Sequence, residues 1–182
     1  MVQYFPGVIR VERMMVIGCP GSGKSTLSRL MAKKTGFPLV HLDQLFWNSG
    51  WQEKSREEFD SILTEELQKD RWIIDGNYSR TISMRLERAD TVVFMDYPSV
   101  VCAYRVLKRV ITRYGESRSD MGENCPERFD MSFLKYVWHF RKTERPKLIS
   151  RLSEAEGKHI IDIKNEKDRK AFLKKLEDKA CK

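Results

Sequence analysis

The stretch from Gly18 to Ser25 constrains the fold of this chain more than any other part. It reads Gly-Cys-Pro-Gly-Ser-Gly-Lys-Ser and fits G-x-x-x-x-G-K-[ST], the phosphate-binding loop called Walker A. An apolar segment suited to a buried strand, 14–17, precedes it, and apolar residues at helical spacing follow it through 34. Glycines bring backbone N–H groups onto phosphate oxygens, and the helix N-terminus adds further donors and partial positive charge.

This loop predicts ATP and Mg²⁺ as cofactors. Lys24 would reach the β- and γ-phosphates, the Ser25 hydroxyl would hold Mg²⁺, and Thr26 would contact the α-phosphate. The residues expected to bind the cofactor are Gly18, Pro20, Gly21, Ser22, Gly23, Lys24, Ser25 and Thr26.

Length and composition indicate one ordinary domain. The chain has 182 residues, of which 41% are hydrophobic, enough to build a core. We find neither an apolar run of the ~20 residues that a membrane span needs nor a signal-peptide pattern before Arg13, which predicts a cytoplasmic protein without membrane contact. The four cysteines form no C-x-x-C pair, so a zinc site is poorly supported.

The net charge of +8 suits either nucleotides or nucleic acid as partners. Much of the excess lies in the helices expected near the C-terminus, where a solvated face is the usual explanation. Nucleic-acid binding is therefore possible but not favoured, and the pattern leaves monomer and homodimer open.

Five apolar segments that alternate with helical patterns predict an α/β fold. The expected strands lie at 13–17, 37–42, 71–76, 90–96 and 159–163. Right-handed crossovers then give a five-stranded parallel sheet with helices on both faces, a three-layer sandwich. Residues 1–12 are expected to form an N-terminal extension, with a possible edge strand at 8–11, and residues 13–182 a single domain.

Three of these strands end at a carboxylate: Asp43, Asp75 and Asp96. The carboxyl ends of parallel strands share the ligand-binding edge of such sheets. Asp43 could position an acceptor hydroxyl, take its proton, or help hold a metal through water. It could equally cap the helix that follows, and the two roles are compatible.

Residues 43–70 are expected to form a small helical insertion on the acceptor side. Its first part carries Phe46, Trp47 and Trp51, which could stack on a planar substrate or pack the insertion onto the body of the domain. Ser55 and the acidic residues after it read as the start of a helix.

Arginines at helical spacing and a long polar segment follow. Arg105, Arg109 and Arg113 lie four residues apart on one helix face, where they could clamp phosphates or form a solvated face. Residues 114–130 are polar and too long for an ordinary connection, so we expect a lid there. Arg141 and Arg145 are four residues apart in the next helix.

The chain resembles the adenylate kinase–like branch of the P-loop kinases from Arg13 to the last helix. The segment 73–81, Ile-Ile-Asp-Gly-Asn-Tyr-Ser-Arg-Thr, is similar to the family's hydrophobic-D-G-F-P-R-T signature. The segments HLDQLFW and DGNYSRT, the lid and the Arg-Pro pair at 145–146 are more closely similar to the bacterial, FlaR-related "DNA topology modulation proteins".

This resemblance implies a P-loop NTPase fold and roles for particular residues. Asp75 is the first candidate to orient Mg²⁺ through water, and Asp96 is the alternative. Either carboxylate would act together with the Ser25 hydroxyl. The expected substrate-binding residues are Asp43, Phe46, Trp47, Asp75, Asn77 and Arg80. The expected catalytic residues are Lys24, Asp43, Arg105, Arg109, Arg141 and Arg145, with Arg118 or Arg128 contributed by the lid.

The chain departs from the family pattern at two positions. One extra residue precedes Arg80, and Phe46 stands where the family offers an arginine for the acceptor's phosphate. These departures argue against a monophosphate acceptor, and the aromatic residues of the insertion favour a planar or partly apolar acceptor instead.

The function expected from the sequence is ATP- and Mg²⁺-dependent phosphoryl transfer to a small acceptor, as in nucleotide kinases. A nucleotide-dependent DNA-binding regulator that modulates topology through the basic C-terminal helix is one alternative, although no helix-turn-helix or zinc-finger pattern supports it. A simple NTPase, which turns ATP over without an acceptor, is another.

Overall fold

A computed structural model describes residues 11–180 of the chain. Most of the expected N-terminal extension, with its possible edge strand at 8–11, lies outside the described residues. Within them, no helix is both long enough and apolar enough to span a membrane.

The centre of the molecule is a parallel sheet of five strands, as predicted. In chain order the strands are β1 (Arg13–Gly18), β2 (Leu39–His41), β5 (Trp72–Asp75), β6 (Thr91–Met95) and β7 (His159–Ile163). They lie in the order β2-β5-β1-β6-β7, and every neighbouring pair is parallel. Strand β1 is therefore central, and the phosphate loop leaves from its carboxyl end.

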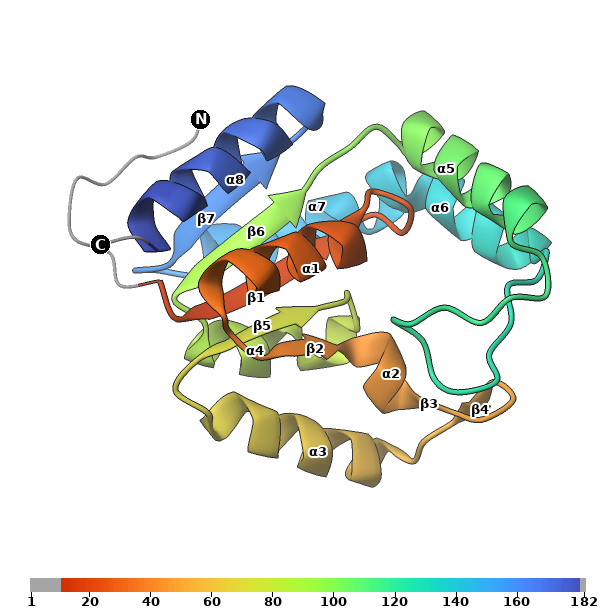
Figure 1. Cartoon of the computed structure of the whole chain (residues 1–182), viewed down its shortest axis with the longest axis horizontal. Coiled ribbons are helices and arrows are strands. Elements are labelled where there is room, and N and C mark those ends of the chain that lie inside the picture. Colours follow the sequence, from red (N-terminus) through yellow and green to blue (C-terminus); the bar gives the residue numbers. More distant parts are fainter. Residues whose placement is uncertain (1–10, 181–182) are drawn as a thin grey trace.

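Helices cover both faces of this sheet, which is why the central strands are almost entirely apolar. Helices α1 (Lys24–Thr35) and α8 (Glu166–Ala180) contact each other in front of the sheet in Figure 1, with α4 (Ile82–Arg88) and α7 (Arg145–Ser153) behind it. Helices α5 (Ser99–Thr112) and α6 (Met131–Thr143) pack together beyond the carboxyl ends of the strands. The predicted three-layer α/β sandwich is confirmed.

The expected insertion contains more structure than the sequence indicated. It consists of α2 (Leu42–Phe46), a hairpin of β3 (Trp47–Asn48) and β4 (Gln52–Glu53), and α3 (Arg56–Gln68). The hairpin was not predicted; it turns through Gly50 and Trp51, both at positive φ (74° and 64°). Ser55 caps α3 by accepting from the Glu58 N–H at 3.1 Å, as its sequence indicated.

Two sequence interpretations in this region need correction or refinement. Asp43 lies inside the first turn of α2, and His41 takes the N-cap position, so Asp43 is not the helix cap. Phe46 packs among three other rings, with its centroid 4.9 Å from Trp47, 5.5 Å from Phe59 and 5.0 Å from Tyr78, which makes it a packing residue of the insertion.

Helix α4 does not follow β5 directly, because the side chain of Arg85 stabilises a turn between them. Its guanidinium, which is fully buried, donates to the carbonyl of Gly76 at 2.8 Å and also to the carbonyls of Asn77 and Tyr78. Burial lowers the pKa of Arg85 to about 9. The chain therefore passes through a turn, with Tyr78 at φ 33°, and a short 3₁₀ segment (Ser79–Thr81) before α4 begins.

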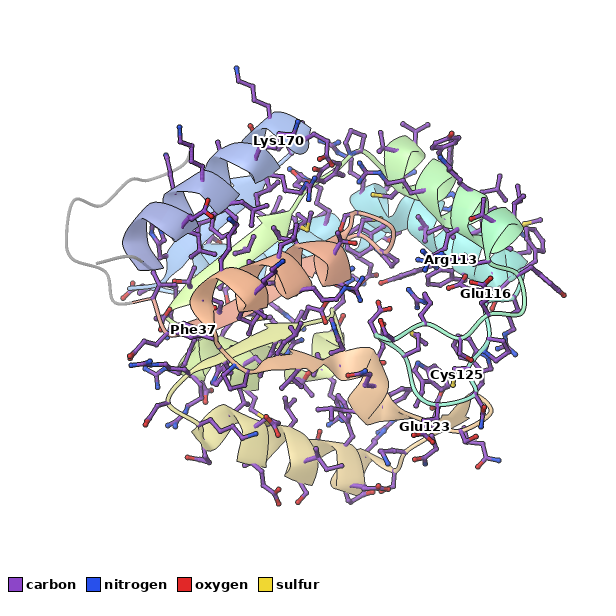
Figure 2. All side chains as sticks on the ribbon, viewed as in Figure 1. Phe37, Arg113, Glu116, Glu123, Cys125 and Lys170 are labelled. Atoms are coloured by element: carbon purple, nitrogen blue, oxygen red, sulfur yellow. The ribbon has the colours of Figure 1, made fainter. Side chains whose placement is uncertain are left out.

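The segment 114–130 crosses from α5 to the hairpin without forming a helix or strand of its own. Its backbone is tied to the hairpin where the Gly50 N–H donates to the Asn124 carbonyl at 3.2 Å. Gly122 lies so close to Trp47 that a Cβ atom there would come within 2.1 Å of the Trp47 carbonyl oxygen. Figure 2 shows Glu123 and Cys125 on the part of the segment beside the hairpin.

Replacing Arg85 by methionine is expected to lower the free energy of unfolding by about 3 kcal/mol, because the carbonyls of the 76–78 turn lose a charged donor. Urea unfolding followed by circular dichroism measures the change. Arg88→Met is the matched control: Arg88 is exposed, and its loss is expected to cost under about 1 kcal/mol. Equal losses for the two variants would contradict the role of Arg85.

Candidate nucleotide site and adjoining cavity

The phosphate loop has the backbone geometry that anion binding requires. Gly18, Gly21 and Gly23 all have positive φ, at 141°, 82° and 97°. Gly23 is the N-cap of α1, and no side chain caps that helix end. The N–H groups of the first turn therefore remain available to a phosphate.

Lys24 lies against this loop at the start of α1. Its ammonium group donates to the carbonyls of Gly18 at 3.0 Å and Cys19 at 3.2 Å. Burial lowers the pKa of Lys24, while the carboxylates of Asp75 and Asp43 act in the opposite direction. The side chain is thus a cation held at the loop, with two carboxylates close by.

The loop opens into a cavity of ≈650 Å³, which we call the larger cavity. Six of the eight residues expected to bind the cofactor line it: Pro20, Gly21, Gly23, Lys24, Ser25 and Thr26. Ser22 is buried, and its carbonyl accepts from Arg105 at 3.0 Å. Gly18 does not line the cavity, and its N–H donates to the Asn77 Oδ1 at 3.0 Å.

The larger cavity is strongly cationic, as a triphosphate site must be. Three carboxylates, Asp43, Asp75 and Asp120, face a set of seven lysine and arginine side chains: Lys24, Arg29, Arg105, Lys108, Arg109, Arg113 and Arg118. The expected row Arg105, Arg109 and Arg113 lies along one wall.

The two carboxylates considered for a metal differ in their partners. Asp75 accepts a hydrogen bond from His41 Nδ1 at 2.6 Å through Oδ1, and its buried Oδ2 has no partner among the described residues. Asp96 is instead held by Arg145, whose Nε and Nη2 donate to its two oxygens at 2.7 and 2.6 Å. Asp75 lines the larger cavity, so it is the carboxylate that could serve Mg²⁺ beside Ser25.

Three of the expected arginines do not line either cavity. Arg145 is engaged with Asp96, and that contact raises the pKa of Arg145. Arg141 is exposed on α6. Arg80 forms a two-pronged ion pair with Asp60, at 2.5 and 2.8 Å, on the outer surface of the insertion. The structure does not bring these three arginines to the site.

A second, smaller cavity of ≈330 Å³ adjoins the first, between the insertion, α5 and the segment 114–130. Trp47 and Trp51 line it, as do apolar side chains of α5 and α6. Five residues line both cavities and form a shared wall: Asp43, Tyr78, Arg109, Arg118 and Phe133.

Asp43 is the carboxylate of this shared wall. The Tyr78 hydroxyl donates to its Oδ1 at 2.8 Å. Burial raises the pKa of Asp43, although the hydrogen bond from Tyr78 and the charge of Lys24 oppose that shift. A carboxylate in this position can accept a proton from a hydroxyl that enters from the smaller cavity.

The segment 114–130 reaches the phosphate loop through Asp120. This side chain, 5% exposed, accepts a hydrogen bond from Ser25 and lies 3.5 Å from Arg118. Burial acts to raise the pKa of Asp120, but Arg118 and Ser25 outweigh it and the pKa is lowered. The segment therefore forms part of the wall of the larger cavity, through Arg118, Ser119 and Asp120.

Sequence reasoning missed several residues that line the site. Tyr78 lies in the segment 73–81, but no pattern in the sequence assigns it a role. Its positive φ brings its hydroxyl to Asp43, and the sequence does not predict that backbone conformation. His41 was visible two residues before Asp43, but its pairing with Asp75 depends on the adjacency of β2 and β5. Arg29 and Asp120 also line the cavity, but the sequence did not indicate which side chains of α1 and of the segment 114–130 would face it.

The glycine loop, the parallel sheet and the cationic cavity together define a P-loop fold, which implies nucleotide binding. Residues 14–124 match the family model described as an AAA domain, and the chain belongs to that family.

Two curated relatives, from Thermococcus gammatolerans (strain DSM 15229 / JCM 11827 / EJ3) and Thermococcus onnurineus (strain NA1), are each named "Putative adenylate kinase". The first is 30% identical over 116 residues, which cover 60% of this chain and 60% of the relative. The second is 26% identical over 116 residues, which cover 60% and 59%. The matched region thus spans about 60% of the relatives' length.

Two solved structures share the fold at 16% sequence identity. A shikimate kinase from Acinetobacter baumannii, in complex with shikimate, has a TM-score of 0.59 and coverage of 92% of both chains. A protein from Chloroflexus aurantiacus J-10-fl that is described as a "putative kinase" has a TM-score of 0.54, with coverage of 93% of this chain and 98% of that one. At this identity the likeness establishes the fold alone. These matches do not show the resemblance to DNA topology modulation proteins, which stays a prediction.

The two carboxylates can be separated by substitution. Asp75→Asn is expected to weaken Mn²⁺ binding in the nucleotide complex about tenfold or more, because a carboxylate that lines the larger cavity loses its charge. Asp96→Asn is expected to leave that affinity unchanged and to lower the free energy of unfolding by about 2 kcal/mol, because Arg145 loses its charged partner. Electron paramagnetic resonance of Mn²⁺ and urea unfolding measure the two effects. The opposite pattern would assign the metal to Asp96.

Proposed function

We propose that this protein transfers the γ-phosphoryl group of ATP to a hydroxyl group of a small acceptor. The observation that carries the proposal is the wall shared by two cavities, one cationic and built on the phosphate loop, the other mostly apolar. A donor in the first cavity and an acceptor in the second would meet at Asp43. Binding both molecules in one orientation supplies a large part of the catalysis in phosphoryl transfer.

The donor side would be formed by the loop amides, Lys24 and the row of arginines. The N–H groups at the start of α1 would hold the β- and γ-phosphates, and Lys24 would move from the loop carbonyls onto them. Ser25 would hold Mg²⁺, with Asp75 acting through water, and the ion would neutralise charge on the β- and γ-oxygens.

On the acceptor side, Asp43 would take the proton of the attacking hydroxyl. The acceptor oxygen forms a bond to the γ-phosphorus, the bond from that phosphorus to the β,γ-bridging oxygen breaks, and ADP leaves. The raised pKa of Asp43 makes it a better proton acceptor than an exposed aspartate, and Tyr78 fixes the carboxylate in place.

The charge that develops during transfer would meet the arginines of the shared wall. Arg109 and Arg118 line both cavities, and Arg105 and Arg113 lie along the donor side. The segment 114–130, docked through Asp120, would exclude water and so suppress hydrolysis of ATP. Arg141 and Arg145, which the family resemblance implied as catalytic, have no part in this proposal.

The test is ADP production from Mg·ATP with a panel of acceptors: nucleosides, nucleoside monophosphates and small hydroxylated metabolites. One class of acceptor is expected to stimulate turnover well above the rate without acceptor. Lys24→Ala should abolish that stimulation while its circular dichroism spectrum stays unchanged, because the fold does not depend on the ammonium group. Turnover that ignores every acceptor would contradict the proposal and favour a simple NTPase.

Asp43→Asn separates proton acceptance from binding. The variant is expected to lower kcat about 100-fold or more, since the proton acceptor is lost, while affinity for ATP changes little. Steady-state kinetics and calorimetric titration with a non-hydrolysable ATP analogue give the two quantities. An equal loss of kcat and ATP affinity would place Asp43 in a metal or structural role instead.

A further inference from the structure

The smaller cavity has walls suited to a flat ring. Trp47 and Trp51 meet edge to face with centroids 5.3 Å apart, and Phe133 and Tyr78 line the side next to the donor. Aliphatic side chains of α5 complete the wall, Val106, Leu107 and Val110. Aromatic walls bind planar rings through stacking and edge contacts, and they tolerate many ring systems because each has a π-face.

Two of the three arginines that line the smaller cavity share one carboxylate. Glu127, 6% exposed, lies 2.9 Å from the Nε of Arg109 and 2.9 Å from the Nε of Arg118, so one buried carboxylate occupies two arginines. Arg128 lies over the ring of Trp51, 4.8 Å from its centroid, and Asp130 caps α6 by accepting from the Phe133 N–H.

Three arginines and three carboxylates therefore line the smaller cavity, in contrast to the strong cationic excess of the larger one. A phosphate placed in the smaller cavity would have to compete with Glu127 for Arg109 and Arg118. It would also approach Asp43, the carboxylate at which the reacting hydroxyl must lie. Burying a charge without a free partner is costly, whereas an uncharged hydroxyl compound carries no such cost.

Building on the proposed function, we propose that the acceptor is an uncharged, hydroxyl-bearing molecule with a flat ring, of the nucleoside class. Trp47 and Trp51 hold the ring, and Asp43 receives the hydroxyl. Glu127 lines the smaller cavity but not the larger one, so it offsets Arg109 and Arg118 on the acceptor side and excludes acceptors that already carry a phosphate. Both arginines also line the larger cavity, where the donor's phosphates reach them. Glu127 is thus a specificity-determining residue of the segment 114–130.

The test is calorimetric titration of the full chain, with the larger cavity filled by a Mg²⁺-loaded non-hydrolysable ATP analogue. Adenosine, guanosine, cytidine and thymidine are compared with their 5′-monophosphates, and shikimate serves as a hydroxylated acid without an aromatic ring. Each nucleoside that binds is expected to bind at least about tenfold more tightly than its monophosphate, since only the phosphate must be desolvated without a partner. Monophosphates or shikimate binding as tightly as every nucleoside would overturn the inference.

This comparison is independent of the proposed reaction, because the wild-type protein is used and no transfer is measured. Failure of the ATP analogue to bind would overturn the proposed function. The same titrations without the analogue would then still decide between the nucleoside and the monophosphate.

Two pairs of variants locate the effect. Glu127→Gln is expected to strengthen monophosphate binding about tenfold, because it releases two arginines, with nucleoside binding unchanged. Glu123→Gln changes an exposed acid on the same segment (Figure 2); it is the control and should change neither affinity.

Trp47→Ala is expected to weaken nucleoside binding about tenfold through lost stacking, and Trp138→Ala, which changes an exposed residue of α6, should have no effect. A Glu127→Gln protein that remains folded, as thermal unfolding would show, and still rejects monophosphates would contradict the role of Glu127.

Discussion

The N–H groups in the first turn of α1 have no partners within their own helix, and much of the structure keeps them available to an anion. Gly23 takes the N-cap position without a capping side chain, and Asn77 accepts from the N–H of Gly18. Arg85 in turn fixes the turn that carries Asn77 by binding its carbonyl and those of its neighbours. A fully buried arginine is thus used to shape the loop that meets the nucleotide.

The second organising feature is the way charge is divided between the two cavities. Cations predominate where a triphosphate would lie, while the adjoining cavity balances its arginines with carboxylates. Glu127 and Asp120, both on the segment 114–130, carry out much of this division by engaging Arg109 and Arg118. This segment therefore determines how far these two arginines are available to a ligand.

The fold was predictable because its signals are local. The glycine loop fixes a strand before it and a helix after it, and the remaining strands are short apolar runs bounded by turns. The site was predictable only where the chain itself provides the geometry, as in the loop and the Arg105, Arg109 and Arg113 row. The pairing of Arg145 with Asp96 and of Arg80 with Asp60 joins residues 49 and 20 positions apart, and no periodicity in the sequence reports it. The sequence also left open whether Phe46 would stack on a substrate or pack the insertion, and the fold uses its ring for packing.

The measurement that tests this account most directly is the phosphorus balance of the reaction, followed by ³¹P nuclear magnetic resonance. Purified protein is incubated with Mg·ATP and a mixture of nucleosides. The account predicts a new phosphomonoester signal that grows in step with ADP, because the γ-phosphoryl group passes across the shared wall at Asp43 to a hydroxyl. Growth of inorganic phosphate in step with ADP, with no ester signal, would show that water is the acceptor and would contradict the account.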